Sequence, residues 1–218
     1  MKTRLSLAIG LLSMLTVSTF VSAYPEPSRV PLSWELKFKY AEPKRIVVEV
    51  PGEANPKAYW YVTYTVTNNT NEERQFMPAF HMLTKSGKLM RSDKGVPKIA
   101  FDKIKQASGN KLMMSPLQIT GTLNVGEDQA KDGVAIWEEP EAEMGSFSIF
   151  VSGLSGESTQ LKDDAGKPVN DAEGKPVILF KTLQLDYTVS GDEVYPGIDP
   201  INKTHERLGH ALGRSRIA

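Results

Sequence analysis

Segments in which apolar and polar residues alternate recur along this chain and predict a strand-rich fold. In residues 34–40 every second residue is large and apolar, and the residues between them are charged. Successive side chains of a β-strand point to opposite faces, so this pattern predicts a half-buried strand. Residues 59–67 are almost all aromatic or β-branched, which predicts a longer strand, and residues 46–50 predict a shorter one.

Further strands and one helix are predicted downstream. The strand candidates are residues 76–83, 117–125, 134–137, 147–151 and 179–189. We expect 76–83 to pair with 59–67, with Pro78 at an edge or a bulge because proline cannot donate to a ladder. Residues 97–107 predict the helix, since Pro97 suits a first helical position and Gly109 follows as a stop. A short repeat beginning at Asp164 and Asp171 predicts two successive tight turns.

Many short strands with turns between them predict an all-β chain folded as an antiparallel β-sandwich with one minor helix. After residue 23 of 218 the chain keeps 195 residues, enough for one large β domain, which we place at residues 24–200. Residues 201–218 lose the alternation and are basic, so they predict a loose, flexible C-terminal tail.

Residues 1–23 have the layout of a cleavable signal peptide. Lys2 and Arg4 precede the apolar residues 5–17, and Val21 and Ala23 occupy the recognition positions before the cleavage site. A membrane anchor is the alternative, but the apolar run is shorter than the roughly 20 residues that span a bilayer. We therefore expect an exported protein, periplasmic or extracellular, with no transmembrane segment after cleavage.

Charge and cysteine content exclude two classes of protein. The chain has no cysteine, so it is not a disulfide scaffold and must gain its stability from core burial. Without Lys2 and Arg4, 24 cations face 26 anions, a net charge of −2 (24 minus 26). Nucleic-acid-binding proteins normally carry a basic face, so no nucleic-acid partner is expected.

Three segments resemble exported bacterial proteins with immunoglobulin-like or fibronectin-like domains. They are residues 59–70, an aromatic and Thr/Val strand that ends in Asn-Asn-Thr, and residues 151–155 and 181–187. The resemblance implies an immunoglobulin-like sandwich. It implies no functional residue, and the cysteine pair of true immunoglobulin domains is absent.

No catalytic arrangement is predicted. Residues 153–157, Gly-Leu-Ser-Gly-Glu, resemble a nucleophile elbow, but that motif requires glycine where Glu157 stands. Of the three histidines, His205 and His210 lie in the expected loose tail, where no rigid scaffold would position a base, and His81 stands apart from them. The chain is therefore predicted not to be an enzyme.

Copper handling is an alternative function, because an exported chain without cysteine offers soft thioether and imidazole ligands. The candidate ligands are Met77, His81, Met82, Met90, Met113 and Met114. On one strand Met77 and His81 would lie about 13 Å apart, and His81 and Met82 would point to opposite faces. Packing of the methionines in the core is the preferred interpretation. The acidic run 138–143 lacks the spacing of a calcium loop, and no cofactor is predicted.

Tyr59 and Tyr61 are the candidate ligand-binding residues. They share the strand face opposite to Trp60 and lie about 7 Å apart at strand spacing. If that face is exposed, their rings form a stacking platform for a sugar or a partner protein. Burial of the face is the competing interpretation and the one we favour.

The sequence as a whole predicts an exported, non-enzymatic binding or structural protein of the cell envelope, with a protein or glycan partner. A carbohydrate-binding module is the first alternative, and it depends on exposure of Tyr59 and Tyr61. A periplasmic copper-handling protein is the second.

Overall fold

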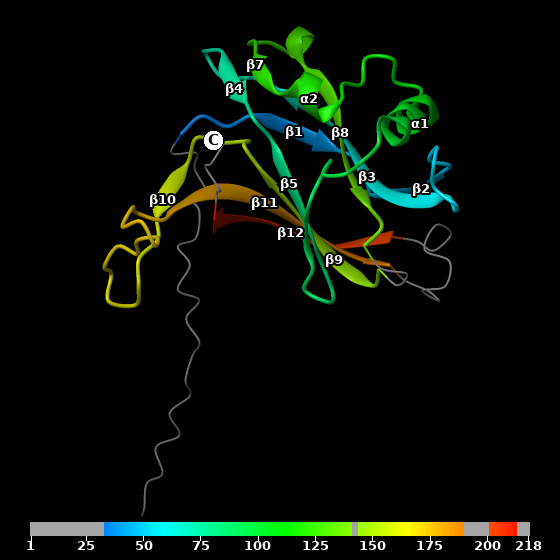
Figure 1. Ribbon diagram of the computed structural model, residues 1–218. Helices are drawn as coiled ribbons and strands as arrows, with labels where there is room; N and C mark the ends of the chain where they lie inside the picture. The colour runs from blue at the N-terminus through cyan, green and yellow to red at the C-terminus, as the bar shows by residue number, and fades with distance from the viewer. Residues whose placement is uncertain (1–32, 141–143, 190–200, 213–218) are drawn as a thin grey trace, which may run out of the picture.

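The computed structural model describes residues 33–140, 144–189 and 201–212, and in these ranges the chain consists mainly of antiparallel β-sheet (Figure 1). Strand accounts for 51% and helix for 11% of it, well below the roughly one third of helix in an average globular protein. The prediction of an all-β chain with minor helix is confirmed. Residues 1–23, the expected signal peptide, lie outside the described ranges.

The first sheet is built around one long central strand. Its members are β1 (Lys37–Tyr40), β2 (Lys44–Val48), β3 (Lys57–Thr67) and β8 (Lys131–Glu138). β8 pairs along one edge of β3, while β1 and β2 pair one after the other along the opposite edge. Pro43 stands between β1 and β2, at an edge where its missing N–H costs no ladder bond.

The second sheet is wider. Its members are β5 (Ala79–Thr84), β6 (Leu89–Arg91), β9 (Ser146–Ser152), β10 (Ser158–Gln160), β11 (Ile178–Val189) and β12 (Ile201–Leu212). β12 pairs along one edge of β11, β9 and β10 share its other edge, and β5 and β6 follow β9 outward.

Two of the predicted strands are divided differently in the structure. Residues 76–83 were expected to pair with 59–67, and this was wrong. The chain breaks at Pro78 into β4 (Arg74–Phe76) and β5, and β5 joins the second sheet. Residues 117–125 were expected to form one strand. They contribute instead to the short helix α2 (Pro116–Ile119), capped by the Ser115 side chain, and to β7 (Gly121–Leu123), which pairs with β4.

The prediction of a loose tail from residue 201 was also wrong for the residues that the structure describes. β12 pairs with β11 at eleven register positions, from Ile201 opposite Val189 to Leu212 opposite Leu179. The register shifts between Asp186 and Tyr187, so Thr204 is an extra residue on β12. Opposite the buried Leu185 and Tyr187 of β11, β12 has Glu206 and Lys203, so no alternation of apolar residues marks this strand.

The two predicted tight turns are confirmed at the exposed tip between β10 and β11. The Gly166 N–H donates to the Asp163 carbonyl, and the Gly174 N–H donates to the Asp171 carbonyl. Each aspartate carboxylate also accepts two backbone N–H groups of its own turn, which is the reason aspartate suits this position. The first turn begins at Asp163, one residue before the predicted Asp164.

The apolar faces of the two sheets meet in one core, so the arrangement is sandwich-like. The Trp60 ring of the first sheet lies 5.6 Å from that of Phe147 in the second, and the Tyr64 and Phe80 rings lie 4.8 Å apart (centroid distances). Trp60 is fully buried, and its indole N–H donates to the Glu139 carboxylate, which also pairs with Arg45. This core supplies the stability that a chain without disulfides requires.

The helix α1 (Lys98–Ser108) covers the other face of the first sheet, as Figure 1 shows. It confirms the predicted helix, with Pro97 before it and Gly109 in a left-handed conformation (φ 68°) after it. Ile104 of α1 packs with Tyr59 and Tyr61 of β3 in a second buried cluster. Together with the short 3₁₀ turn η1 (Glu127–Gln129), the helices in the described ranges lack the length and apolarity needed to cross a membrane.

Loop residues cover the outer edge of β8. The Asp93 N–H donates to the Ile136 carbonyl, the Ile136 N–H donates to the Asp93 carboxylate, and the Met114 N–H donates to the Asp132 carbonyl. Asp93 adopts a left-handed conformation (φ 66°) to do this, and burial raises the pKa of its carboxyl to about 6. This edge of the first sheet is therefore closed to further pairing.

We predict that Trp60→Ala and Tyr61→Ala are both strongly destabilising, because β3 is buried on both faces. Each change removes a large buried ring and should lower the free energy of unfolding by roughly 3–5 kcal/mol, measured by urea denaturation. Leu117→Ala, at a side chain that is 87% exposed, is the control and should change it by less than about 0.5 kcal/mol. A Tyr61→Ala protein as stable as the control would contradict the burial of this face.

Candidate functional site

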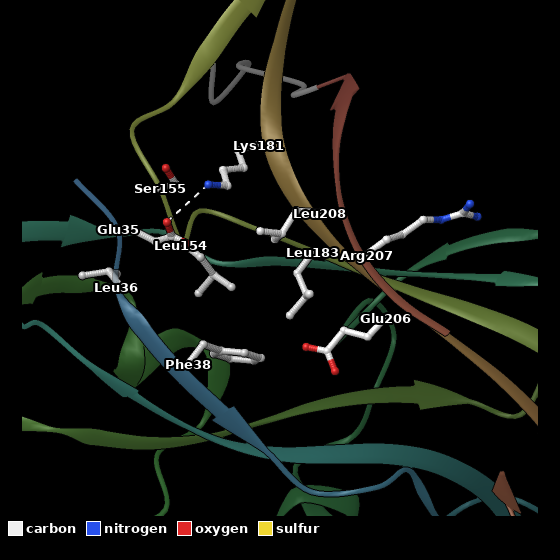
Figure 2. Close-up of a pocket in the computed structure, with 10 residues that line it drawn as sticks. All are labelled: Glu35, Leu36, Phe38, Leu154, Ser155, Lys181, Leu183, Glu206, Arg207 and Leu208. Atoms are coloured by element: carbon white, nitrogen blue, oxygen red, sulfur yellow. Dashed lines mark hydrogen bonds and ion pairs between the residues drawn. The ribbon is translucent and has the colours of Figure 1, made fainter. Parts of the chain in front are cut away.

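A pocket of about 540 Å³ opens between β1 of the first sheet and β12 of the second. We call it the edge pocket. Its lining residues are Glu35, Leu36, Phe38, Leu154, Ser155, Lys181, Leu183, Glu206, Arg207 and Leu208. Figure 2 shows the side chains of Phe38, Leu154, Leu183 and Leu208 converging on the hollow, with Lys181 and Glu35 at one end and Glu206 at the other.

The edge pocket exists because the second sheet extends further than the first. Leu208 of β12 lies opposite Leu183 of β11, whose side chain faces the first sheet. The first sheet ends at β1 on this side, so Leu208 keeps 46% of its surface exposed while Leu183 keeps 9%. Among the described residues, an apolar floor is thus left without a covering strand.

A buried ion cluster forms one end of the edge pocket. Lys181 is only 4% exposed, and its ammonium lies 3.2 Å from a Glu35 oxygen and 3.3 Å from a Glu157 oxygen. The Lys181 N–H also donates to the Glu157 carbonyl, which holds the two residues together. A buried lysine is tolerated only when carboxylates surround it in this way.

Beside this cluster, residues 34–36 connect the second sheet to β1 of the first sheet. Leu36 N–H donates to the Leu154 carbonyl and Gly156 N–H to the Trp34 carbonyl, so residues 34–36 pair with residues 154–156. The Ser155 hydroxyl donates to the Trp34 carbonyl and accepts the Glu157 N–H. The serine of the Gly-Leu-Ser-Gly segment therefore serves to fix this connection.

A second polar cluster forms the other end of the edge pocket. The Tyr40 hydroxyl of β1 donates to the Glu206 carboxylate of β12 at 2.7 Å, and the Lys203 ammonium contacts both groups. Burial and the bond to Glu206 raise the pKa of the Tyr40 hydroxyl, whereas the bonds from Tyr40 and Lys203 lower the pKa of Glu206. These contacts tie the edge of one sheet to the edge of the other.

The edge pocket combines an apolar middle with charged groups at its two ends. Its walls are leucine and phenylalanine side chains. At each end the charged groups form an ion pair, Lys181 with Glu35 at one end and Lys203 with Glu206 at the other. Its volume lies within the range of roughly 300–1,000 Å³ typical of ligand sites. The charged ends can orient a ligand whose centre is apolar.

The structure does not bring the predicted binding residues to this site. Tyr59 and Tyr61 are 1% and 8% exposed and pack under α1, far in the fold from the β1–β12 edge. Burial raises the pKa of both hydroxyls. The exposed stacking platform required for these two residues to bind a ligand is therefore absent, and the burial that the sequence favoured is what the structure contains.

Met82 and Met90 lie opposite each other on β5 and β6, whereas other candidate copper ligands lie elsewhere in the fold. Met82 is buried between the sheets, Met113 is buried in the cluster under α1, and Met77 is exposed. Met90 and Met114 pack against the inter-sheet core. In the described ranges no three histidine, aspartate or glutamate side chains gather as a metal site would require.

Sequence reasoning missed the residues of the edge pocket, although one signal was present. Lys181 occupies an inward position in the alternation of β11, between Leu179 and Leu183. A lysine in such a row requires a buried anion, and Glu157 and Glu35 provide it. The floor residue Leu208 gave no comparable signal, because the preceding inward positions of β12 are the polar residues Lys203 and Glu206.

A second, polar hollow of about 380 Å³ lies on the outer face of the second sheet. Its central carboxylate, Asp186, accepts hydrogen bonds from Ser148 and Gln184 and lies 3.6 Å from Arg207. These polar groups satisfy one another within the sheet, so the edge pocket is the stronger candidate site.

Comparison with known proteins gives no information about this site. No protein-family model, no curated protein and no solved structure matches the chain. The immunoglobulin-like resemblance of residues 59–70 therefore remains a prediction.

We predict that Lys181→Met lowers the free energy of unfolding by roughly 3–5 kcal/mol, because it leaves the buried Glu157 carboxylate without its cation. The double variant Lys181→Met/Glu157→Gln should recover part of this loss in urea denaturation. Lys98→Met is the control, since its exposed pair with Asp102 should contribute less than about 0.5 kcal/mol. Equal stability of Lys181→Met and Lys98→Met would show that the cluster is not needed to hold the pocket end.

Proposed function

We propose that the protein is an exported, non-enzymatic binding protein of the cell envelope, and that the edge pocket is its binding site. The observation that carries this proposal is that Leu208, in the apolar floor of the pocket between β1 and β12, is half exposed. Folded chains rarely leave an apolar concavity uncovered unless something binds there. The layout of residues 1–23 supports export.

The ionisable and nucleophilic groups beside the edge pocket support binding over catalysis. Lys181 is held between two carboxylates, and the Ser155 hydroxyl is engaged with backbone groups on both sides. A nucleophile or a general base needs a neighbouring group that activates it and a free path to its substrate. The Lys181 ammonium and the Ser155 hydroxyl each have partners that account for their positions by a structural role alone.

The alternative functions have less support. A sugar site usually offers an exposed aromatic face, and Tyr59 and Tyr61, which suggested one, are buried. For copper handling the candidate methionines are divided: Met82 is buried in the core between the sheets and Met113 in the cluster under α1, while Met77 is exposed. Phe38 is the one aromatic side chain among the described residues that line the edge pocket, and its ring is stacked against Tyr40 and tilted against Tyr64.

We predict that the native protein binds the apolar probe 1-anilinonaphthalene-8-sulfonate in a saturable manner. The protein should be purified from the envelope fraction, where its N-terminus is expected at Tyr24. Leu208→Glu places a charge in the pocket and should weaken probe binding at least tenfold, whereas Leu117→Glu on α2, the control, should leave it unchanged. Equal binding by the two variants, or a chain recovered from the cytosol with Met1 intact, would refute the proposal.

A further inference from the structure

The edge pocket has a feature that a simple apolar cavity lacks: unpaired backbone along one wall. The Ala41 N–H donates to Thr63 of β3. Because the N–H and C=O of one residue in an antiparallel strand point to the same side, those of Lys39 and Lys37 also face β3. The backbone groups of Phe38 and Tyr40 therefore point away from β3, toward the open side.

On this open side of β1, the residue just before the strand is paired, but the strand itself is not. The Leu36 N–H, which points the same way, donates to the Leu154 carbonyl, in the loop between β9 and β10. Beyond it, no backbone partner of Phe38 or Tyr40 is present among the residues that the structure describes. At the opposite edge of the same sheet, Asp93 and Met114 cover β8. The first sheet thus has one closed edge, at β8, and an opposite edge at which β1 and β2 pair only with β3 among the described residues.

The open backbone lies above the apolar floor that the first sheet fails to cover. An added strand beside β1 would sit opposite β12, over Leu183 and Leu208. Its alternate side chains would point into the edge pocket, because successive residues of a strand face opposite sides. Main-chain bonds would supply affinity and the pocket would select the side chains, as in strand addition generally.

We propose that the edge pocket receives a short extended segment of another protein, which pairs with Phe38 and Tyr40 and inserts apolar side chains at every second position. This proposal rests on the proposed binding function of the same pocket. The accessible backbone favours a peptide over a lipid, since an acyl chain would leave these donors and acceptors unpaired. Tyr40 and Glu206 bound the pocket at one end, so the paired segment is short.

Other parts of this chain are poor occupants. Residues 24–32 and 190–200 lie outside the described ranges, and their sequences hold Pro25, Pro27, Pro31, Pro196 and Pro200. Proline lacks the N–H that strand pairing requires. Residues 213–218, Gly-Arg-Ser-Arg-Ile-Ala, have no alternating apolar pattern. The donor is therefore expected to be a separate protein.

The test uses a displayed library of random seven-residue peptides, selected on the protein and counter-selected on Leu208→Glu. Selected peptides should have apolar residues at alternate positions and no proline between them. Methylation of the backbone nitrogens that face β1 should weaken binding at least tenfold, while methylation of the other nitrogens should not. Bound peptide should also slow hydrogen exchange of the Phe38 and Tyr40 amides.

Three results would overturn the proposal. Peptides that lack alternation or tolerate every methylation would show that the pocket binds side chains without strand pairing. Failure to select any peptide, while 1-anilinonaphthalene-8-sulfonate still binds in a Leu208-dependent manner, would exclude strand addition and leave the binding function standing. A concentration-dependent dimer that Leu208→Glu abolishes in sedimentation would make a second copy of this chain the occupant.

Discussion

The burial of β3 on both faces is the constraint on which the rest of the structure depends. Trp60 packs into the core between the sheets, while Tyr59 and Tyr61 pack under α1. Where α1 covers it, the first sheet is therefore the middle of three layers, although Lys37 and Lys39 of β1 and Val47 of β2 stay exposed. Loop residues close the edge of this sheet at β8 against further pairing. At the opposite edge, β1 and β2 pair only with β3 among the described residues.

Two polar clusters hold that side in a defined shape. Lys181, Glu35 and Glu157 anchor residues 34–36 at one end of the edge pocket, and Tyr40, Glu206 and Lys203 join the sheets at the other. Between them the apolar floor stays open. Because the two clusters fix both ends of the edge pocket, the pocket is preorganised, and binding costs little additional ordering of the protein.

The sequence predicted elements with strong local patterns and failed where the fold is set by distant pairing. The strand around Trp60 and the helix after Pro97 follow from residue type and spacing. β12 was not predicted because polar residues, among them Lys203 and Glu206, occupy its inward positions. Eleven register pairs with β11, not local propensity, hold it. The edge pocket could not be predicted from the sequence for a related reason. It arises because the second sheet is wider than the first, and the pattern of no single segment indicates the width of a sheet.

The most direct test of the account is whether the edge pocket is open in solution. The chain has no cysteine, so single cysteines introduced at Leu208 and Leu185 can be compared by their rates of reaction with 5,5′-dithiobis(2-nitrobenzoate). Leu208→Cys should react nearly as fast as Leu117→Cys on the exposed helix α2, while Leu185→Cys, buried between the sheets, should react only as fast as the protein unfolds. Protection of Leu208→Cys to the same degree as Leu185→Cys would contradict an open pocket.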